Sequence, residues 1–168
     1  LEFRRVLFRS NLGDFEPARD EVPYDRLGEL DRWALDRLSR VVDRARAAYD
    51  AYEFHAVYHL LNNWCAVDLS ALYLDVTKDR LYCAAPDDPA RRGAQTVMHE
   101  MARALAGMLA PILSFLAEDV WAALPGADRP ESVFLSDFPS TPNAWRDDAL
   151  AARFETLLSV RSAVTKEI

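Results

Sequence analysis

The sequence is poor in the residues that build zinc sites and disulfide frameworks. It contains two cysteines and three histidines in 168 residues. Cys65 and Cys83 stand alone, whereas zinc knuckles carry closely spaced cysteine pairs. Disulfides are rare in reducing compartments, and nothing in the sequence resembles a secretory leader. We therefore expect no metal site and no disulfide, and two free thiols in a reduced, cytoplasmic setting.

Long apolar runs are also missing. No stretch reaches the roughly 20 apolar residues that a membrane-spanning helix needs, so we predict no membrane partner. Apolar residues still make up 51% of the chain, which argues against disorder. A chain of this length can bury a core of its own, and we expect a single domain over residues 11–168.

Positive charge is scarce. The 20 lysines and arginines are outnumbered by 27 aspartates and glutamates, for a net charge of −7. Non-specific binding to nucleic acid depends on cations that neutralise phosphates, so we expect no DNA partner. Any RNA contact must come from a local cluster. Residues 78–92 form a segment that is slightly basic, with Lys78, Arg80, Arg91 and Arg92 against Asp79, Asp87 and Asp88.

The apolar pattern is helical in the first half of the chain. Apolar side chains recur at steps of three or four from Leu27 to Tyr52, which predicts a long amphipathic helix with a bundle-type seam. A second helix is expected over residues 52–68. The stretch that follows, residues 69–82, either continues this helix or begins after a break near Asp68. A single long helix is compatible with the absence of glycine and proline from residues 52–85.

The second half contains helix start and stop signals. Asp88 and Pro89 suit the cap and first turn of a central helix, which Pro111 should break beside Ala110. Residues 126–142 are expected to be irregular, with residues 133–135 briefly extended. A last helix is predicted over residues 145–168, with these side chains on the bundle: Leu150, Phe154, Leu157 and Val164. The fold class is an all-α antiparallel helical bundle, with a core over residues 24–124 and a C-terminal loop and helix over residues 125–168.

Familiar catalytic patterns are incomplete. The run that begins at His99 and Glu100 is close to the zinc-binding HExxH motif, but Arg103 stands where the second histidine must be, and a cation cannot ligate zinc. His55 and His59 would share a helix face, but they have no third ligand at an evident spacing. We predict no catalytic residue and no metal ligand.

One stretch organises the rest of the chain. Residues 68–82 read DLSALYLDVTKDRLY, with apolar side chains on one side and charges gathered at one end. This stretch resembles the DLSxxYLDxxKDRLY block of isoleucyl-tRNA synthetases. Further blocks resemble that family in the same order: YEFHAVY at 52–58, NNWC at 62–65 with Trp64 in place of the usual Phe, RRGAQTV at 91–97, LAPILSF at 109–115, EDVW at 118–121 and SVFL at 132–135.

The resemblance implies the anticodon-binding helical bundle of a class I aminoacyl-tRNA synthetase. Its partners would be isoleucine tRNA and the remaining domains of the synthetase. Such a synthetase charges its tRNA using ATP and Mg²⁺, but this chain lacks the HIGH-type and KMSKS-type motifs and should be inactive alone. Many family members carry a C-terminal zinc-binding region, which we expect to follow this chain. Residues 1–10 do not fit the family and are expected to be either a non-native leader or a truncated end.

The charged end of the organising stretch allows two interpretations. In the first, the polar side chains bind tRNA phosphates and anticodon bases, with aromatic rings as stacking platforms. The tRNA-binding candidates are Lys78, Arg80, Arg91, Arg92 and Gln95. In the second, the charges pair with each other and fix how the helices meet. The structural or stacking candidates are Trp64, Asp68, Tyr73, Asp75 and Tyr82. A helical interaction or scaffold module without RNA binding remains the alternative function, and the net acidity favours it.

Overall fold

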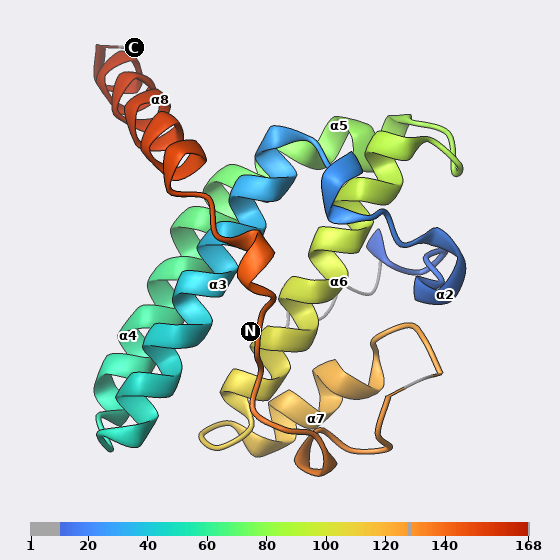
Figure 1. Cartoon of the computed structure of the whole chain (residues 1–168), viewed down its shortest axis with the longest axis vertical. Coiled ribbons are helices and arrows are strands. Elements are labelled where there is room, and N and C mark those ends of the chain that lie inside the picture. The colour runs from blue at the N-terminus through green and yellow to red at the C-terminus, as the bar shows by residue number, and fades with distance from the viewer. Residues whose placement is uncertain (1–10, 128, 168) are drawn as a thin grey trace.

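The computed structural model describes residues 11–127 and 129–167 and shows a bundle of helices (Figure 1). The described residues contain no strand, so the predicted all-α class is confirmed. Residues 1–10, the expected leader or truncated end, lie outside the described residues. The α-helices are α2 (Pro17–Asp20), α3 (Glu29–Asp50), α4 (Phe54–Asn63), α5 (Asp75–Cys83), α6 (Pro89–Leu109), α7 (Ser114–Ala122) and α8 (Asp148–Glu167). The other elements are a π-helix, η2 (Trp64–Leu74), and three short 3₁₀ turns, η1 (Tyr24–Arg26), η3 (Val133–Leu135) and η4 (Asn143–Trp145).

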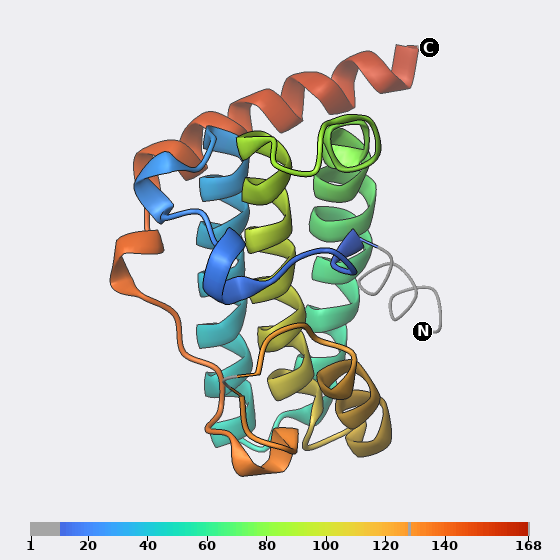
Figure 2. The same cartoon turned by 90° about the vertical axis from the view of Figure 1, so that its right-hand side faces the viewer.

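Helices α3 and α6 and the π-helix η2 enclose the core. Figure 2 shows α3, α6 and the helix formed by α4 and η2 side by side along the bundle, with α5 seen end-on above η2. Leu38 of α3, Val97 of α6 and Tyr73 of η2 are completely buried. Burying one large apolar side chain contributes about 1.5–3 kcal/mol. The wide apolar band predicted for the central helix is confirmed, because α6 is buried over most of its circumference.

Helix α4 runs without interruption through η2 into α5, as the lack of glycine and proline allows. The π-geometry of η2 was not predicted. The Ser70 hydroxyl donates a hydrogen bond of 2.7 Å to the carbonyl of Cys65, five residues earlier. Such π-segments are rare and occur frequently at functional sites. Here η2 coincides with the first half of the organising stretch.

The helix start and stop signals that the sequence predicted around α6 are confirmed. The side chain of Asp88 accepts hydrogen bonds from the backbone N–H groups of Ala90 and Arg91, at 2.8 and 3.1 Å, and Pro89 opens the helix. Helix α6 ends at Leu109 and α7 begins at Ser114, so the break expected near Pro111 is confirmed.

The segment after α7 returns along the outside of the bundle as a strap, residues 129–147, that leads into α8 (Figures 1 and 2). Residues 133–135 form the 3₁₀ turn η3, so the extended conformation predicted for them is wrong. The Ser132 hydroxyl accepts from the N–H of Phe134 at 3.2 Å, and this local bond favours a turn over a strand.

Only the first part of α8 packs on the bundle. Leu150 is buried, and the ring of Phe154 stacks on Trp33 with centroids 5.0 Å apart. Leu157 and Val164 are 58% and 53% exposed, so the prediction that they face the bundle is wrong. Helix α8 crosses α3 near one end and then projects outward (Figure 1), which carries its last turns off the core.

Gly107 of α6 lies against Pro139 of the strap and provides a test of this contact. A Cβ at this position would lie 2.5 Å from Cγ of Pro139 and 2.8 Å from its Cδ. We expect Gly107→Ala to displace the strap and to destabilise the chain by about 1–3 kcal/mol, as overpacked sites do. Gly93→Ala is the matched control in the same helix, because its Cβ would meet Leu27 at an ordinary 3.4 Å. Urea unfolding of both variants compares them. Equal stability of the two would contradict a close strap contact.

Candidate nucleic-acid interface

The carboxylate of Asp14 gathers the polar side chains at the start of α6. Arg91 donates two hydrogen bonds to it, at 2.7 and 2.9 Å, and Gln95 Nε2 donates a third at 2.8 Å. Arg92 Nη1 lies 3.5 Å from Asp14 Oδ2 and donates to Gln95 Oε1 at 2.8 Å. Gln95 is completely buried, and the side chains of Arg91 and Arg92 are only 14% and 12% exposed. Protein oxygens therefore occupy these donors.

The same contacts set the charge state of the cluster. The hydrogen bond from Arg91 is the main cause that lowers the pKa of Asp14, to about 2, against the opposing effect of burial. Asp14 in turn raises the pKa of Arg91 above its usual value. The ion pair is thus fully formed at neutral pH. It ties the segment before α2 to the start of α6.

Replacing Asp14 with asparagine should remove this ion pair while keeping the size of the side chain. We expect a loss of about 1–2 kcal/mol at pH 7, because the carboxylate is partly exposed and solvent weakens the pair. A carboxyl whose folded-state pKa is depressed contributes stability above its unfolded pKa, 3.8, and loses that contribution as pH falls through about 2. The difference between wild type and variant should therefore shrink between about pH 5 and pH 2. Urea titrations across this range measure it. A difference that does not depend on pH would contradict the assignment.

A second carboxylate, Asp31, joins three elements inside the bundle. Asp31 belongs to α3 and is buried. The Tyr73 hydroxyl of η2 donates to its Oδ1 at 2.7 Å, and Arg80 of α5 donates to both oxygens at 2.8 and 2.9 Å. Burial, together with the nearby carboxylate, raises the pKa of Tyr73 well above its usual value, so the hydroxyl keeps its proton. Arg80 is directed inward.

The other predicted site residues divide into buried and exposed groups. Trp64 is buried in the core, and its indole N–H has no hydrogen-bond partner among the described residues. Asp68 accepts from Arg37 at 2.7 Å. Lys78 forms the expected pair with Asp75, at 3.1 Å, and both side chains are more than half exposed.

Tyr82 of α5 is the one stacking candidate with an accessible ring, since 65% of the residue is exposed. Tyr73 and Trp64 are buried and cannot stack on a base in this conformation. The accessible members of the predicted site are thus Lys78, its partner Asp75 and Tyr82, and all three belong to α5.

A groove of about 390 Å³ separates η2 from α8 at the same end of the bundle. Arg161 and Lys166 of α8 line it, and no carboxylate among the described residues pairs with either. Arg161 donates a long hydrogen bond of 3.4 Å to the carbonyl of Ala71. The other lining residues are Val67, Asp68, Ala71, Leu72, Leu158, Ser162 and Thr165.

The sequence interpretation missed both the two anchoring carboxylates and these two cations. Asp31 lies on the apolar stripe of α3 between Leu27 and Ala34, where a charge is out of pattern. Arg161 and Lys166 have no acidic residue three or four positions away in the described part of α8, unlike Lys78, which has Asp75. These are the signals that could have identified them.

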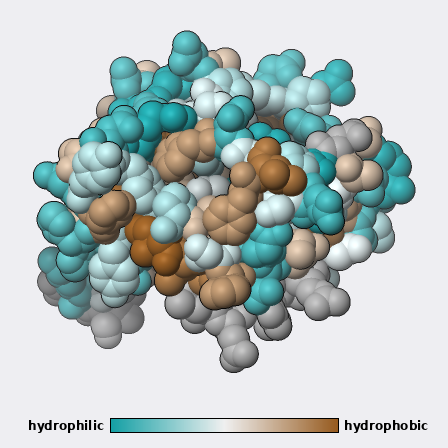
Figure 3. All heavy atoms as spheres, turned by 90° about the horizontal axis from the view of Figure 1, so that it is seen from below, coloured by the Kyte–Doolittle hydropathy of each residue, from teal (hydrophilic) through white to brown (hydrophobic). Residues whose placement is uncertain are grey.

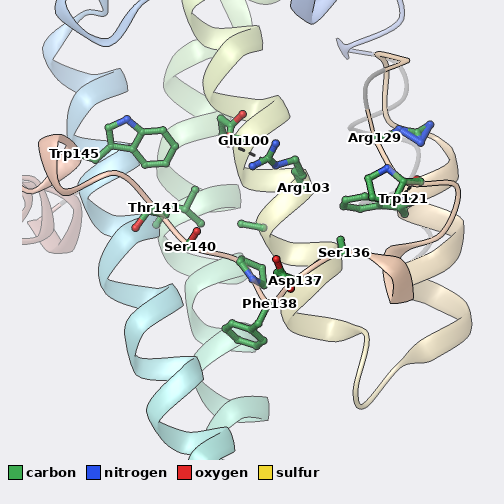
Figure 4. Close-up of a pocket in the computed structure, with 15 residues that line it drawn as sticks. Glu100, Arg103, Trp121, Arg129, Ser136, Asp137, Phe138, Ser140, Thr141 and Trp145 are labelled. Atoms are coloured by element: carbon green, nitrogen blue, oxygen red, sulfur yellow. Dashed lines mark hydrogen bonds and ion pairs between the residues drawn. The ribbon is translucent and has the colours of Figure 1, made fainter.

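A second pocket, of about 230 Å³, lies between α6 and the strap (Figure 4). Its labelled side chains include Glu100 and Arg103, 3.9 Å apart, on α6. On the strap, Thr141 donates to Ser39 of α3 at 2.9 Å, and Ser136 donates to the carbonyl of Val133 at 2.6 Å. These hydroxyls hold the strap in place, and the pocket is a seam beneath it.

Comparison with known proteins identifies the domain. Residues 31–168 match the family model described as the anticodon-binding domain of tRNA ligase. The chain belongs to this family. It is similar to the isoleucine–tRNA ligases of Syntrophotalea carbinolica (48% identity over 158 residues), Moorella thermoacetica (48% over 160) and Desulforudis audaxviator (48% over 167). These matches cover 94%, 95% and 99% of this chain but only 17%, 17% and 18% of the ligases. The chain thus spans about a sixth of the length of the relatives it matches.

The predicted family and its isoleucine type are therefore confirmed, and what the chain covers is the anticodon-binding domain. Across residues 11–127 and 129–167, no three histidine, cysteine, aspartate or glutamate side chains come together as metal ligands would. No helix of this described region combines the length and apolarity that crossing a membrane requires. The tRNA-binding role of Lys78, Arg80, Arg91, Arg92 and Gln95 stays a prediction.

Proposed function

We propose that this anticodon-binding domain recognises the anticodon stem-loop of isoleucine tRNA within a cytoplasmic ligase that charges that tRNA with isoleucine, using ATP and Mg²⁺. The observation that carries the proposal is the similarity to isoleucine–tRNA ligases over nearly the whole chain. An anticodon loop is single-stranded, so its bases are open to stacking and to hydrogen bonds on their pairing edges.

The accessible cations at one end of the bundle support direct contact with RNA. Lys78 is exposed on α5, and Arg161 and Lys166 line the groove beside η2. We assign phosphate contacts to these three, because the donors of Arg161 and Lys166 are free of carboxylates and the pair of Lys78 is exposed to solvent. An exposed pair contributes little and exchanges easily for a phosphate. Tyr82 offers the neighbouring ring for stacking.

For Arg80, Arg91, Arg92 and Gln95 we assign a positioning role. Their hydrogen bonds to Asp31 and Asp14 fix the start of α6 and the end of α5, the elements that flank the proposed RNA surface. Direct contact would require them to leave the buried Asp31 or the partly exposed Asp14 unpaired, which is costly above all at Asp31. The net acidity of the domain is compatible with this division, because most of its cations are already paired internally.

Specific recognition can be tested with the parent ligase and a fluorescent anticodon stem-loop hairpin. We expect a hairpin with a scrambled anticodon to bind at least about tenfold more weakly than the isoleucine hairpin, a difference of about 1.4 kcal/mol. Anisotropy titrations measure both dissociation constants. Equal affinities would contradict anticodon recognition. Absence of any hairpin binding would favour the scaffold alternative, which the net charge of −7 supports.

The two roles of the arginines predict different salt behaviour. Arg91→Ala with Arg92→Ala should weaken hairpin binding while leaving the slope of log Kd against log salt unchanged, if the pair acts by positioning. Direct phosphate contacts would instead flatten that slope by about 1.4 for two single-strand contacts. Circular dichroism of the variant checks that the bundle remains folded.

A further inference from the structure

Large apolar side chains gather at the end of the bundle opposite α5. This end is formed by the α3–α4 turn, the α6–α7 turn and η3, all at the bottom of Figure 1. Figure 3 views it directly and shows apolar side chains grouped among polar ones. We call this surface the apolar end face, and its members are Tyr52, Phe54, Leu113, Phe115, Phe134 and Leu135. Phe115 is 92% exposed, Tyr52 is 80% exposed, and the others are between 39% and 70% exposed.

The turn between α3 and α4 presents one of these rings outward. Tyr52 has φ of +57°, the left-handed region that non-glycine residues rarely adopt. This conformation closes α3 with a Schellman motif: the N–H of Tyr52 donates to the carbonyl of Tyr49 at 2.9 Å, and the N–H of Glu53 donates to the carbonyl of Ala48 at 2.8 Å. The cap leaves the ring of Tyr52 exposed, with an edge contact to Phe54 at 6.3 Å between centroids.

Fixed contacts beneath the face hold its members in place. Tyr49 donates a hydrogen bond of 2.7 Å to the carbonyl of Met108 and packs edge-on against Phe54 and Phe138. On the other side, Glu118 of α7 accepts from the Ser132 hydroxyl and from the N–H of Val133, at 3.0 and 3.2 Å. The α3–α4 turn and η3 are thus each tied to their neighbours, and the face is preformed.

We infer that the apolar end face docks against the remainder of the ligase polypeptide. Contiguous exposed apolar patches on soluble proteins mark protein contacts. RNA is a poor occupant, because much of its affinity comes from cations that neutralise phosphates and none of the six members of this face is charged. More than four-fifths of the length of each matched ligase lies outside the segment that this chain covers. That polypeptide is the partner always present beside the domain, at an effective concentration no separate protein matches.

The inference rests on the proposed function and adds to it a separate role for each end of the bundle. The exposed cations and Tyr82 lie at the α5 end, and the apolar end face lies at the other end of the long helices (Figure 1). The continuous segment of α4, η2 and α5 joins the two ends and so sets the distance between RNA and ligase body. A fixed dock matters, because small misplacements of a bound substrate can cost a hundredfold in rate.

The test uses the full-length ligase with Phe115→Asp and Leu135→Asp together. Both side chains are exposed, so the charges leave the core of the bundle intact. We expect a lower-temperature unfolding transition to separate from the main one, and faster proteolysis between the domain and the ligase body. The kcat/KM for charging tRNA should fall at least about tenfold, with isoleucine-dependent ATP–pyrophosphate exchange within about twofold of wild type. Val76→Asp, an exposed apolar residue of α5, is the matched control for unfolding and proteolysis.

The outcomes separate this inference from the proposed function. Unchanged unfolding and proteolysis in the double variant would overturn the docking inference, whatever the ligase binds. A shift from dimer to monomer in sedimentation, with no change in the domain's coupling to the ligase body, would also overturn it in favour of a second copy on this face. If the wild-type ligase did not bind the hairpin, the proposed function would instead be overturned. The proteolysis result would still decide the docking inference.

Discussion

Replacing Asp31 with alanine is expected to lower the free energy of unfolding by about 3–5 kcal/mol, the largest effect of any single substitution proposed for this domain. Asp31 is buried and accepts three hydrogen bonds, one from Tyr73 and two from Arg80. Its removal leaves a guanidinium and a hydroxyl without their acceptor, in a region from which water is largely excluded. Small domains are stable by only about 5–15 kcal/mol, so a loss of this size is a large fraction of the total. Urea unfolding followed by circular dichroism measures it.

Two variants isolate the cause of this loss. Tyr73→Phe removes one hydrogen bond and should cost about 1–2 kcal/mol. Asp75→Ala breaks the exposed pair with Lys78, three residues apart on α5, and should change stability only slightly. If Asp31→Ala costs no more than Asp75→Ala, Asp31 does not hold α3, η2 and α5 together.

The second large effect is expected at Asp36, which anchors the junction of the strap and α8. Its buried carboxylate accepts from Arg40 at 2.8 and 3.0 Å and from the N–H of Asp147 at 3.1 Å. Arg40 also reaches Asp148 at 2.6 Å, and both carboxylates raise its pKa. We expect Asp36→Ala to cost about 2–4 kcal/mol, less than Asp31 because Arg40 is partly exposed.

The loss of stability caused by Asp36→Ala should be confined to the junction of the strap and α8. Releasing Asp147 frees the start of α8, so limited proteolysis should cut near residues 142–150 faster than in wild type. Asp148→Ala is the matched control: its side chain is almost fully exposed, and we expect little loss of stability. Identical cleavage of Asp36→Ala and wild type would show that α8 is held by its apolar contacts with Trp33 alone.

Periodicity and helix signals were sufficient to predict most of the fold. The seam of α3, the Asp88 cap and the break near Pro111 follow from local chemistry, because each depends on residues close together in the sequence. The errors lie where tertiary geometry decides. Leu157 and Val164 continue a helical pattern, but α8 leaves the bundle before it reaches them.

The candidate site was harder to predict, because the partners of its cations are remote in sequence. Arg91 meets Asp14, 77 residues away, and Arg80 meets Asp31, 49 residues away. Residue type alone predicts that an arginine binds an anion. It does not distinguish a phosphate from a carboxylate supplied by another helix. The family blocks indicated this region, and the structure divides its cations into paired, inward ones and accessible ones.

The proposed RNA surface depends on this division between paired and accessible cations, and the salt dependence of RNA binding tests it most directly. The measurement is log Kd against log salt for the isoleucine anticodon hairpin and the parent ligase, as wild type and with Lys78→Ala, Arg161→Ala and Lys166→Ala combined. Each lost single-strand phosphate contact lowers the slope by about 0.7, so the account predicts a decrease of about 2 with weaker binding. An unchanged slope in the folded triple variant would contradict it and place the RNA on another surface.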